Sequence, residues 1–228
     1  MIHSVITPVN ELKKKLDNAR RPVYYFTHWK AAPTMTKDSA KNKILEHAAQ
    51  IIHRKGFNNT GIQEILESAG VPKGSFYFYF KSKEDLGLAL VDHFAEGFGS
   101  MWRSILGDSQ TRYIKRLERF FEEGRIRYEQ NEWKAGCPIG NLTQEMGILN
   151  EAFQAKLNKV FNNMKNAISA CLTQAQVEGD ISPALDPDAT ADFILNSWEG
   201  ALLRMKAEGH TGPLVLFQKM IFDLVLRA

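Results

Sequence analysis

The sequence predicts an all-α fold of about nine helices, in which a small N-terminal domain of three short helices precedes a larger helical body. Two observations support this fold class. Apolar residues recur at helical spacing through long segments of the 228-residue chain. Proline and glycine fall between these segments, where helices begin and end, and do not alternate with strand-like runs.

Three short helices are predicted between residues 37 and 83. The first runs from about Asp38 to Lys55, carries one stripe of isoleucine and alanine, and stops at a glycine. The second, Ile62 to Ala69, is followed by a Gly-Val turn, and Pro72 opens a third helix that extends to Phe78. Two short helices joined by a tight glycine turn, with another helix packed against them, are the helix-turn-helix pattern.

Six longer helices are predicted in the rest of the chain. Ser82 with Asp85 three residues later is a capping pair that opens the first of them. Asp186 followed by Pro187, and Pro213 after a glycine, open the last two, because proline fits the first turn of a helix. The six helices are expected at about residues 83–106, 109–130, 137–148, 150–178, 187–207 and 212–227.

Domain boundaries follow from these elements. Residues 1–36 are interrupted by three prolines, and we interpret them as a weakly ordered basic extension. Met35 precedes the first clear helix, which makes it an alternative start of the protein. Residues 37–83 form the helix-turn-helix domain, and residues 84–228 form the body.

Charge is divided unequally between the two parts. The chain has a formal net charge of +3, but residues 1–83 hold fourteen Lys or Arg against six Asp or Glu, whereas residues 84–228 hold fifteen against twenty. A basic front with a mildly acidic body indicates that the front meets a polyanion such as DNA. A chance imbalance of solvated charges remains the alternative interpretation.

Several functional classes are not supported by the sequence. No apolar run is long enough to span a membrane, no secretory signal begins the chain, and two cysteines do not make a disulfide scaffold, so we expect a cytoplasmic protein. The sequence shows no glycine-rich phosphate loop, no metal-spaced Cys/His cluster and no arguable nucleophilic triad. We therefore expect no enzymatic activity, no metal and no cofactor.

A run of about fifty residues resembles the signature of the TetR family of transcriptional regulators. The resemblance rests on these residues in register: Ile44-Leu45-x2-Ala48-x7-Gly56-Phe57, Thr60-x-Ile62-x2-Ile65, and Ala69-Gly70-Val71-x-Lys73-Gly74-Ser75-Phe76-Tyr77-x-Tyr79-Phe80-x-Ser82-Lys83-Glu84-x-Leu86. It implies an N-terminal DNA-binding domain on a larger, variable helical domain that binds an effector and dimerises.

The resemblance also implies which residues touch DNA. Lys73 and Gln63 are the candidates for base edges, and the others would mostly hold phosphate. The full set is Thr60, Gln63, Lys73, Gly74, Ser75, Tyr77, Tyr79 and Lys83. Tyr79 stands where the family usually has histidine, and Phe78 where tyrosine or histidine is frequent, so a base contact by Phe78 would be apolar, for instance with a thymine methyl.

The body is expected to hold the effector pocket and the dimer interface. Aromatic residues and polar groups embedded in apolar runs are the candidates for the pocket, although each also suits an ordinary core or a contact with a neighbouring helix. The candidate residues are Trp102, Phe120, Cys137, Asn141, Glu145, Trp198, Glu199 and Arg204. The resemblance implies that the last two helices pair with their counterparts in a homodimer.

Cys137 belongs to a Gly-Cys-Pro-Ile-Gly segment, residues 136–140, that resembles a stretch found in a subset of the same family. The cysteine lies just before a predicted helix, where the helix dipole would lower its pKa and favour the thiolate. Some family members sense electrophiles or oxidants through a cysteine, whereas cysteine is also a common small buried residue.

Together these features predict a ligand-responsive transcriptional repressor. It would bind double-stranded DNA at a palindromic operator as a homodimer and be released by a small, partly apolar effector. An electrophile- or redox-sensing repressor that acts through Cys137 is one alternative. A DNA-binding protein without an effector is the other, although the large aromatic body counts against it.

Overall fold

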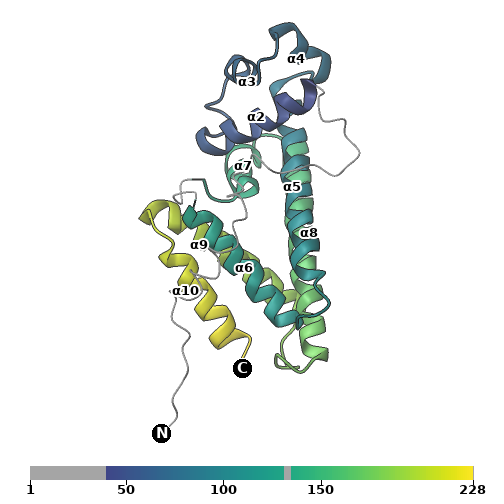
Figure 1. Cartoon of the computed structure of the whole chain (residues 1–228), viewed down its shortest axis with the longest axis vertical. Coiled ribbons are helices and arrows are strands. Elements are labelled where there is room, and N and C mark those ends of the chain that lie inside the picture. The colour runs from purple at the N-terminus through teal and green to yellow at the C-terminus, as the bar shows by residue number, and fades with distance from the viewer. Residues whose placement is uncertain (1–39, 131–134, 228) are drawn as a thin grey trace.

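The computed structural model describes residues 40–130 and 135–227, and the expected extension 1–36 with Met35 lies outside them. Within these residues the chain folds into nine α-helices and one π-helical turn, without a strand, which confirms the all-α prediction (Figure 1). No helix in this part of the chain is long and apolar enough to cross a membrane. The helices are α2 (Ala40–Lys55), α3 (Ile62–Ala69), α4 (Lys73–Tyr79), α5 (Lys83–Leu106), α6 (Tyr113–Gln130), α7 (Pro138–Met146), α8 (Glu151–Val177), α9 (Pro187–Glu208) and α10 (Gly212–Met220), followed by η2 (Ile221–Val225).

The first three helices form the predicted helix-turn-helix domain. Gly70 ends α3 with a left-handed φ of 63°, a conformation that glycine adopts without steric cost, and Pro72 precedes the first residue of α4. The three helices enclose a small core of fully buried side chains, chiefly Ile44, Ala48, Phe57, Ile65, Phe76 and Phe80. The turn therefore holds α3 and α4 at a fixed angle on α2.

The helix starts of the body follow the predicted capping. Ser82 accepts a hydrogen bond from the Asp85 amide at the start of α5, and Asp186 accepts from the two amides that open α9. Asn150 caps α8 in the same way, although the sequence argument did not use it. In the body, helices α6, α8, α9 and α10 pack around one continuous apolar core.

Helix α5 belongs to both domains. It starts beside α2 in the DNA-binding domain and runs down the body alongside α8, while α7 lies directly beneath the DNA-binding domain (Figure 1). At the crossing of these elements a Cβ on Gly87 would lie 2.5 Å from Phe153 and 2.6 Å from Phe57. Both rings are buried and meet edge to face with centroids 5.6 Å apart. The absent side chain of Gly87 thus lets the two domains pack closely.

Candidate nucleic-acid interface and ligand cavities

Helix α4 turns one side to the core and the other to solvent. Phe76 is fully buried, whereas Lys73, Gly74, Tyr77 and Phe78 are exposed. In Figure 1, α3 and α4 form the end of the molecule opposite the lower end of α10. A short helix that projects from one end with a polar and aromatic surface has the geometry of a recognition helix.

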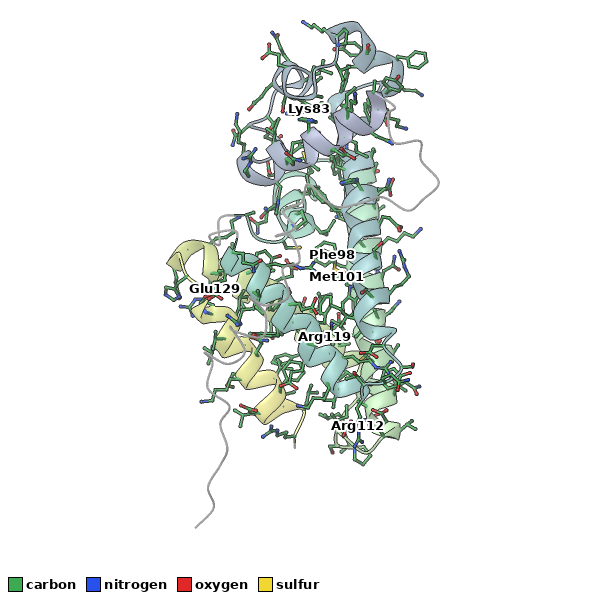
Figure 2. All side chains as sticks on the ribbon, in the orientation of Figure 1. Lys83, Phe98, Met101, Arg112, Arg119 and Glu129 are labelled. Atoms are coloured by element: carbon green, nitrogen blue, oxygen red, sulfur yellow. The ribbon has the colours of Figure 1, made fainter. Side chains whose placement is uncertain are left out.

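The other expected DNA contacts lie around α4. Gln63 is exposed and donates to Glu67 at 2.9 Å, and Ser75 and Tyr79 are partly exposed. Lys83, labelled in Figure 2, is partly exposed; its Nζ lies 4.7 Å above the Phe57 ring and 3.4 Å from the Asn58 carbonyl oxygen. This lysine therefore stabilises the turn between α2 and α3 as well as carrying charge to the surface.

The expectation that the Thr60 side chain contacts DNA needs correction. Thr60 is only 1% exposed, and its hydroxyl donates to the Gly56 carbonyl oxygen at 2.7 Å. A hydroxyl that satisfies a buried carbonyl is not free to bind phosphate without breaking that bond. Its role in this structure is to close the turn that precedes α3.

Two hydrogen-bonded links join α7 and its lead-in to the DNA-binding domain. At one end, burial lowers the pKa of His53, and the ring Nε2 lies 2.8 Å from the Gly136 carbonyl oxygen, so the neutral imidazole donates to it. At the other end, the Glu145 carboxylate accepts from the amides of Phe57 and Asn58 at 2.9 and 2.8 Å. We call the Glu145 contact the junction link. Hydrogen bonds to a charged acceptor are among the stronger ones in proteins.

The junction link corrects the expectation for Glu145. The side chain points into the domain junction and not into either cavity described below, and it stands against Gly56, where an added Cβ would lie 3.0 Å from its Oε1. Gly56 has a φ of 89°, so glycine is required there for backbone conformation as well as for space. Sequence reasoning missed both this role and that of His53, because the bonded partners lie more than eighty residues apart.

A small cavity of about 20 Å³ lies where α7 starts, against α9. Cys137, Asn141 and Glu199, all expected ligand contacts, line it together with Lys206. Asn141 is fixed on both sides, because its amide donates to the Ala135 carbonyl oxygen at 2.8 Å and its Oδ1 accepts from Lys206 at 3.0 Å. The volume is that of about one water molecule, so an effector larger than this does not fit.

The structure overturns the expected thiolate at Cys137. The side chain is 5% exposed, and burial raises the pKa of its thiol well above the ordinary value, with the negative charge of Glu199 adding to the effect. Its Sγ also accepts from the Gly140 amide at 3.4 Å, but that weak bond does not offset burial. Burial likewise raises the pKa of Glu199 to about 7. The site therefore holds a protonated thiol beside a carboxyl that titrates near neutral pH.

The raised pKa of Glu199 makes stability depend on pH. Between about pH 4.5 and 7 the folded protein keeps a proton that the unfolded chain has released, so stability falls as pH rises through this range. Glu199→Gln should therefore be more stable than the wild type by about 3 kcal/mol at pH 8 and nearly equal to it at pH 4.5. Urea unfolding at both pH values measures this, with Glu46→Gln at an exposed carboxylate as the control. An equal difference at both pH values would contradict the assignment.

A larger groove of about 600 Å³ opens between α5 and α8. Trp102 lines it and stacks on Phe120, with ring centroids 3.8 Å apart, while Phe98 adds a second aromatic wall. Figure 2 shows Phe98 and Met101 on the side of α5 that faces α6. The indole nitrogen of Trp102 is buried and has no hydrogen-bond partner in the described part of the chain. This volume lies in the range of small-molecule sites.

Two other expected pocket residues lie elsewhere. Trp198 is 8% exposed and belongs to an aromatic core, with its ring centroid 5.0 Å from that of Phe121 and 5.1 Å from that of Phe217. Arg204 is exposed on the outer side of α9 and forms an ion pair with Glu208. Neither lines either of the two cavities described above, because α9 turns its tryptophan inward and its arginine to solvent.

An apolar surface covers the outer side of the last helices. Large side chains on α9, α10 and η2 are between 44% and 58% exposed. Such a group of exposed apolar side chains is typical of an interface with another chain. The residues are Phe193, Leu203, Val215, Leu216, Met220 and Leu224.

Comparison with known proteins assigns the fold and the recognition helix to one family. Residues 44–90 match the family described as "Bacterial regulatory proteins, tetR family", and residues 114–221 match "Tetracyclin repressor-like, C-terminal domain". The transcriptional regulator AcuR of Cereibacter sphaeroides is 38% identical over 183 residues, which cover 79% of this chain and 82% of that protein. The repressor DhaR of Mycobacterium sp. strain GP1 is 31% identical over 192 residues, or 84% and 95% of the two chains.

A solved structure agrees with these sequence relatives. The regulatory protein TetR from Rhodobacter sphaeroides superposes with a TM-score of 0.77 at 34% identity, over 81% of this chain and 97% of that one. The matched regions include α4 and both domains described above. This chain belongs to the TetR family of transcriptional regulators, whose members bind DNA as dimers and are not enzymes.

Proposed function

We propose that this protein is a ligand-responsive transcriptional repressor of the cytoplasm. It binds a palindromic operator as a homodimer, with α4 in the major groove and the apolar surface of α9, α10 and η2 at the dimer interface. Repression is supported by the relative DhaR, which is named a repressor. The response to a ligand is supported by the way in which the body holds the DNA-binding domain.

The two domains are joined through different helices of the body, and this observation carries the proposal. The DNA-binding domain is continuous with α5. By contrast, α7 packs on α8, and it is bonded to the DNA-binding domain through its residue Glu145 and through Gly136 just before its start. A molecule that enters the groove between α5 and α8 changes the separation of these two helices. The change must strain the junction link, so occupancy of the groove and the position of α4 are coupled.

The groove also limits the chemistry of the effector. Its walls combine Trp102, Phe98, Val160 and Met164, which favour an apolar or aromatic body. The effector is accordingly a small, partly apolar molecule.

The two alternatives are less well supported. The electrophile-sensing alternative rested on a helix start that would favour the Cys137 thiolate, and burial has the opposite effect on that thiol. An effector-independent DNA-binding protein has no need of an open groove beside the helix that leads to its recognition helix.

Operator binding is the first test of the proposal. Lys73→Ala removes an exposed ammonium from the recognition helix and should weaken binding to the selected operator about tenfold while affecting random DNA less. Lys83→Ala should weaken binding to the operator and to random DNA alike. It should also lower the slope of binding affinity against salt concentration by about one released counterion. Fluorescence anisotropy at several salt concentrations measures both, with Lys159→Ala on α8 as the matched control. Equal losses on operator and random DNA for Lys73→Ala would refute its assignment to a base edge.

A further inference from the structure

Phe78 is the most exposed aromatic residue in the described part of the chain. Its side chain is 83% exposed, and its ring meets that of Tyr79 edge to face with centroids 4.9 Å apart. Together with Tyr77, which is 62% exposed, it gives α4 an exposed aromatic surface of the kind that another molecule covers. The apolar surface on α9, α10 and η2 does not account for it, because α4 lies at the opposite end of the molecule (Figure 1).

Gly74 supplies an independent observation on the same side of α4. It precedes Phe78 by four residues, so both project from the side opposite the buried Phe76. Glycine inside a helix costs up to about 1 kcal/mol relative to alanine. Nothing in the described part of the chain explains it, because a Cβ at Gly74 would meet no atom there within 4 Å and its φ is not positive. A close approach from outside the molecule does explain it.

Charge identifies the approaching molecule. Lys73 and Lys81 lie at the two ends of α4 and are exposed, and Lys41 adds an exposed ammonium group on α2. A surface of this charge faces the phosphates of DNA, and the major groove admits a helix. An aromatic ring that reaches base edges there has one apolar partner in the groove, the C5 methyl group of thymine.

We propose that Phe78 determines operator sequence by contacting a thymine methyl in each half-site. This inference rests on the proposed function, since it places α4 in the major groove. Gly74 allows the helix backbone to approach the bases, and Phe78, one turn later, inserts its ring against the methyl group. The contact reads thymine by burying apolar surface, without a hydrogen bond.

Removing only the methyl group tests the contact. The operator is first selected from random DNA by the full-length protein, and each thymine of one half-site is then replaced by uracil. We expect one thymine per half-site at which this replacement weakens binding about fourfold, and about fifteenfold when both half-sites are changed, since burying one methyl-sized group favours binding by that factor. Replacing that thymine by 5-methylcytosine should weaken binding less than replacing it by cytosine.

Protein variants assign the effect to Phe78. Phe78→Ala should bind the thymine and uracil operators equally, and Phe78→Leu should keep part of the discrimination. Val177→Ala, at an exposed apolar residue of α8 far from α4, is the control and should discriminate as the wild type does. Because Phe78 is exposed, the circular dichroism and thermal unfolding of Phe78→Ala should match those of the wild type.

The outcomes separate the inference from the proposed function. If the wild type selects an operator but no uracil replacement weakens its binding more than that of Phe78→Ala, the inference is wrong and the repressor proposal stands. If the wild type selects no sequence over random DNA, both are wrong.

Discussion

Glu145→Ala is expected to lower the free energy of unfolding by about 3 kcal/mol and to weaken operator binding. The change removes two hydrogen bonds to a charged acceptor and leaves the amides of Phe57 and Asn58 without it. It also detaches the turn between α2 and α3 from α7, so that of the two links described above only the one from His53 to Gly136, just before α7, remains. Thermal and urea unfolding measure the first effect, and anisotropy on the selected operator measures the second.

Amide hydrogen exchange locates the effect of Glu145→Ala. The amides of Phe57 and Asn58 should exchange faster in the variant, while the Val71 amide, which bonds to Leu66 within the same domain, should change little. Glu145→Gln keeps one acceptor oxygen and should lie between the wild type and Glu145→Ala. Uniformly faster exchange across α2, α3 and α4 would show general destabilisation and contradict the local role of the junction link.

Gly87→Ala is the second substitution with a large expected effect. One methyl group would overlap two buried rings at 2.5 and 2.6 Å, and neither ring has space to withdraw. Overpacking of this kind costs about 1–3 kcal/mol, which exceeds the gain of about 1 kcal/mol from replacing a helical glycine by alanine. We expect a net loss in the free energy of unfolding and a displaced DNA-binding domain, because the rings belong to α8 and to the turn after α2.

A double variant tests the cause of that loss. Phe153→Leu makes room beside Gly87, so Gly87→Ala combined with it should be less destabilised than the sum of the two single changes. Gly200→Ala on α9, where an added Cβ meets nothing within 4 Å, is the control and should be neutral or slightly stabilising. Additive losses in the double variant would show that the destabilisation arises elsewhere.

Local signals in the sequence predicted the elements of this fold well. The nine helices appear where glycine, proline and capping residues placed them, and Ser82 and Asp186 cap their helices as expected. The last helix ends earlier than predicted, since Ile221–Val225 forms a π-helical turn, and no sequence pattern had indicated that change. These features depend on neighbours a few residues apart, which a single sequence displays.

Contacts between distant segments were not predictable in the same way. Glu145 was expected in a ligand pocket because a carboxylate among apolar residues needs a partner, but the sequence does not show which amides provide it. The thiol of Cys137 was misjudged for a related reason: the helix start is visible in the sequence, whereas burial against Glu199 is not. Sequence reasoning therefore located polar groups that matter and could not name their partners.

Helix α5 is shared by both domains, so a tilt of this helix at the groove would displace the DNA-binding domain at its other end. The groove residues on this helix lie about 15 residues from its start, so they are about 22 Å from the DNA-binding end at 1.5 Å per residue. A tilt of about 5° at the groove would then carry that end about 2 Å sideways, and a symmetric dimer would double the change. Half-sites recognised by a dimer stand about 34 Å apart, a spacing fixed by the DNA itself. Under the proposed function, a small ligand in the groove would thus prevent simultaneous docking of both recognition helices without disturbing the fold of either.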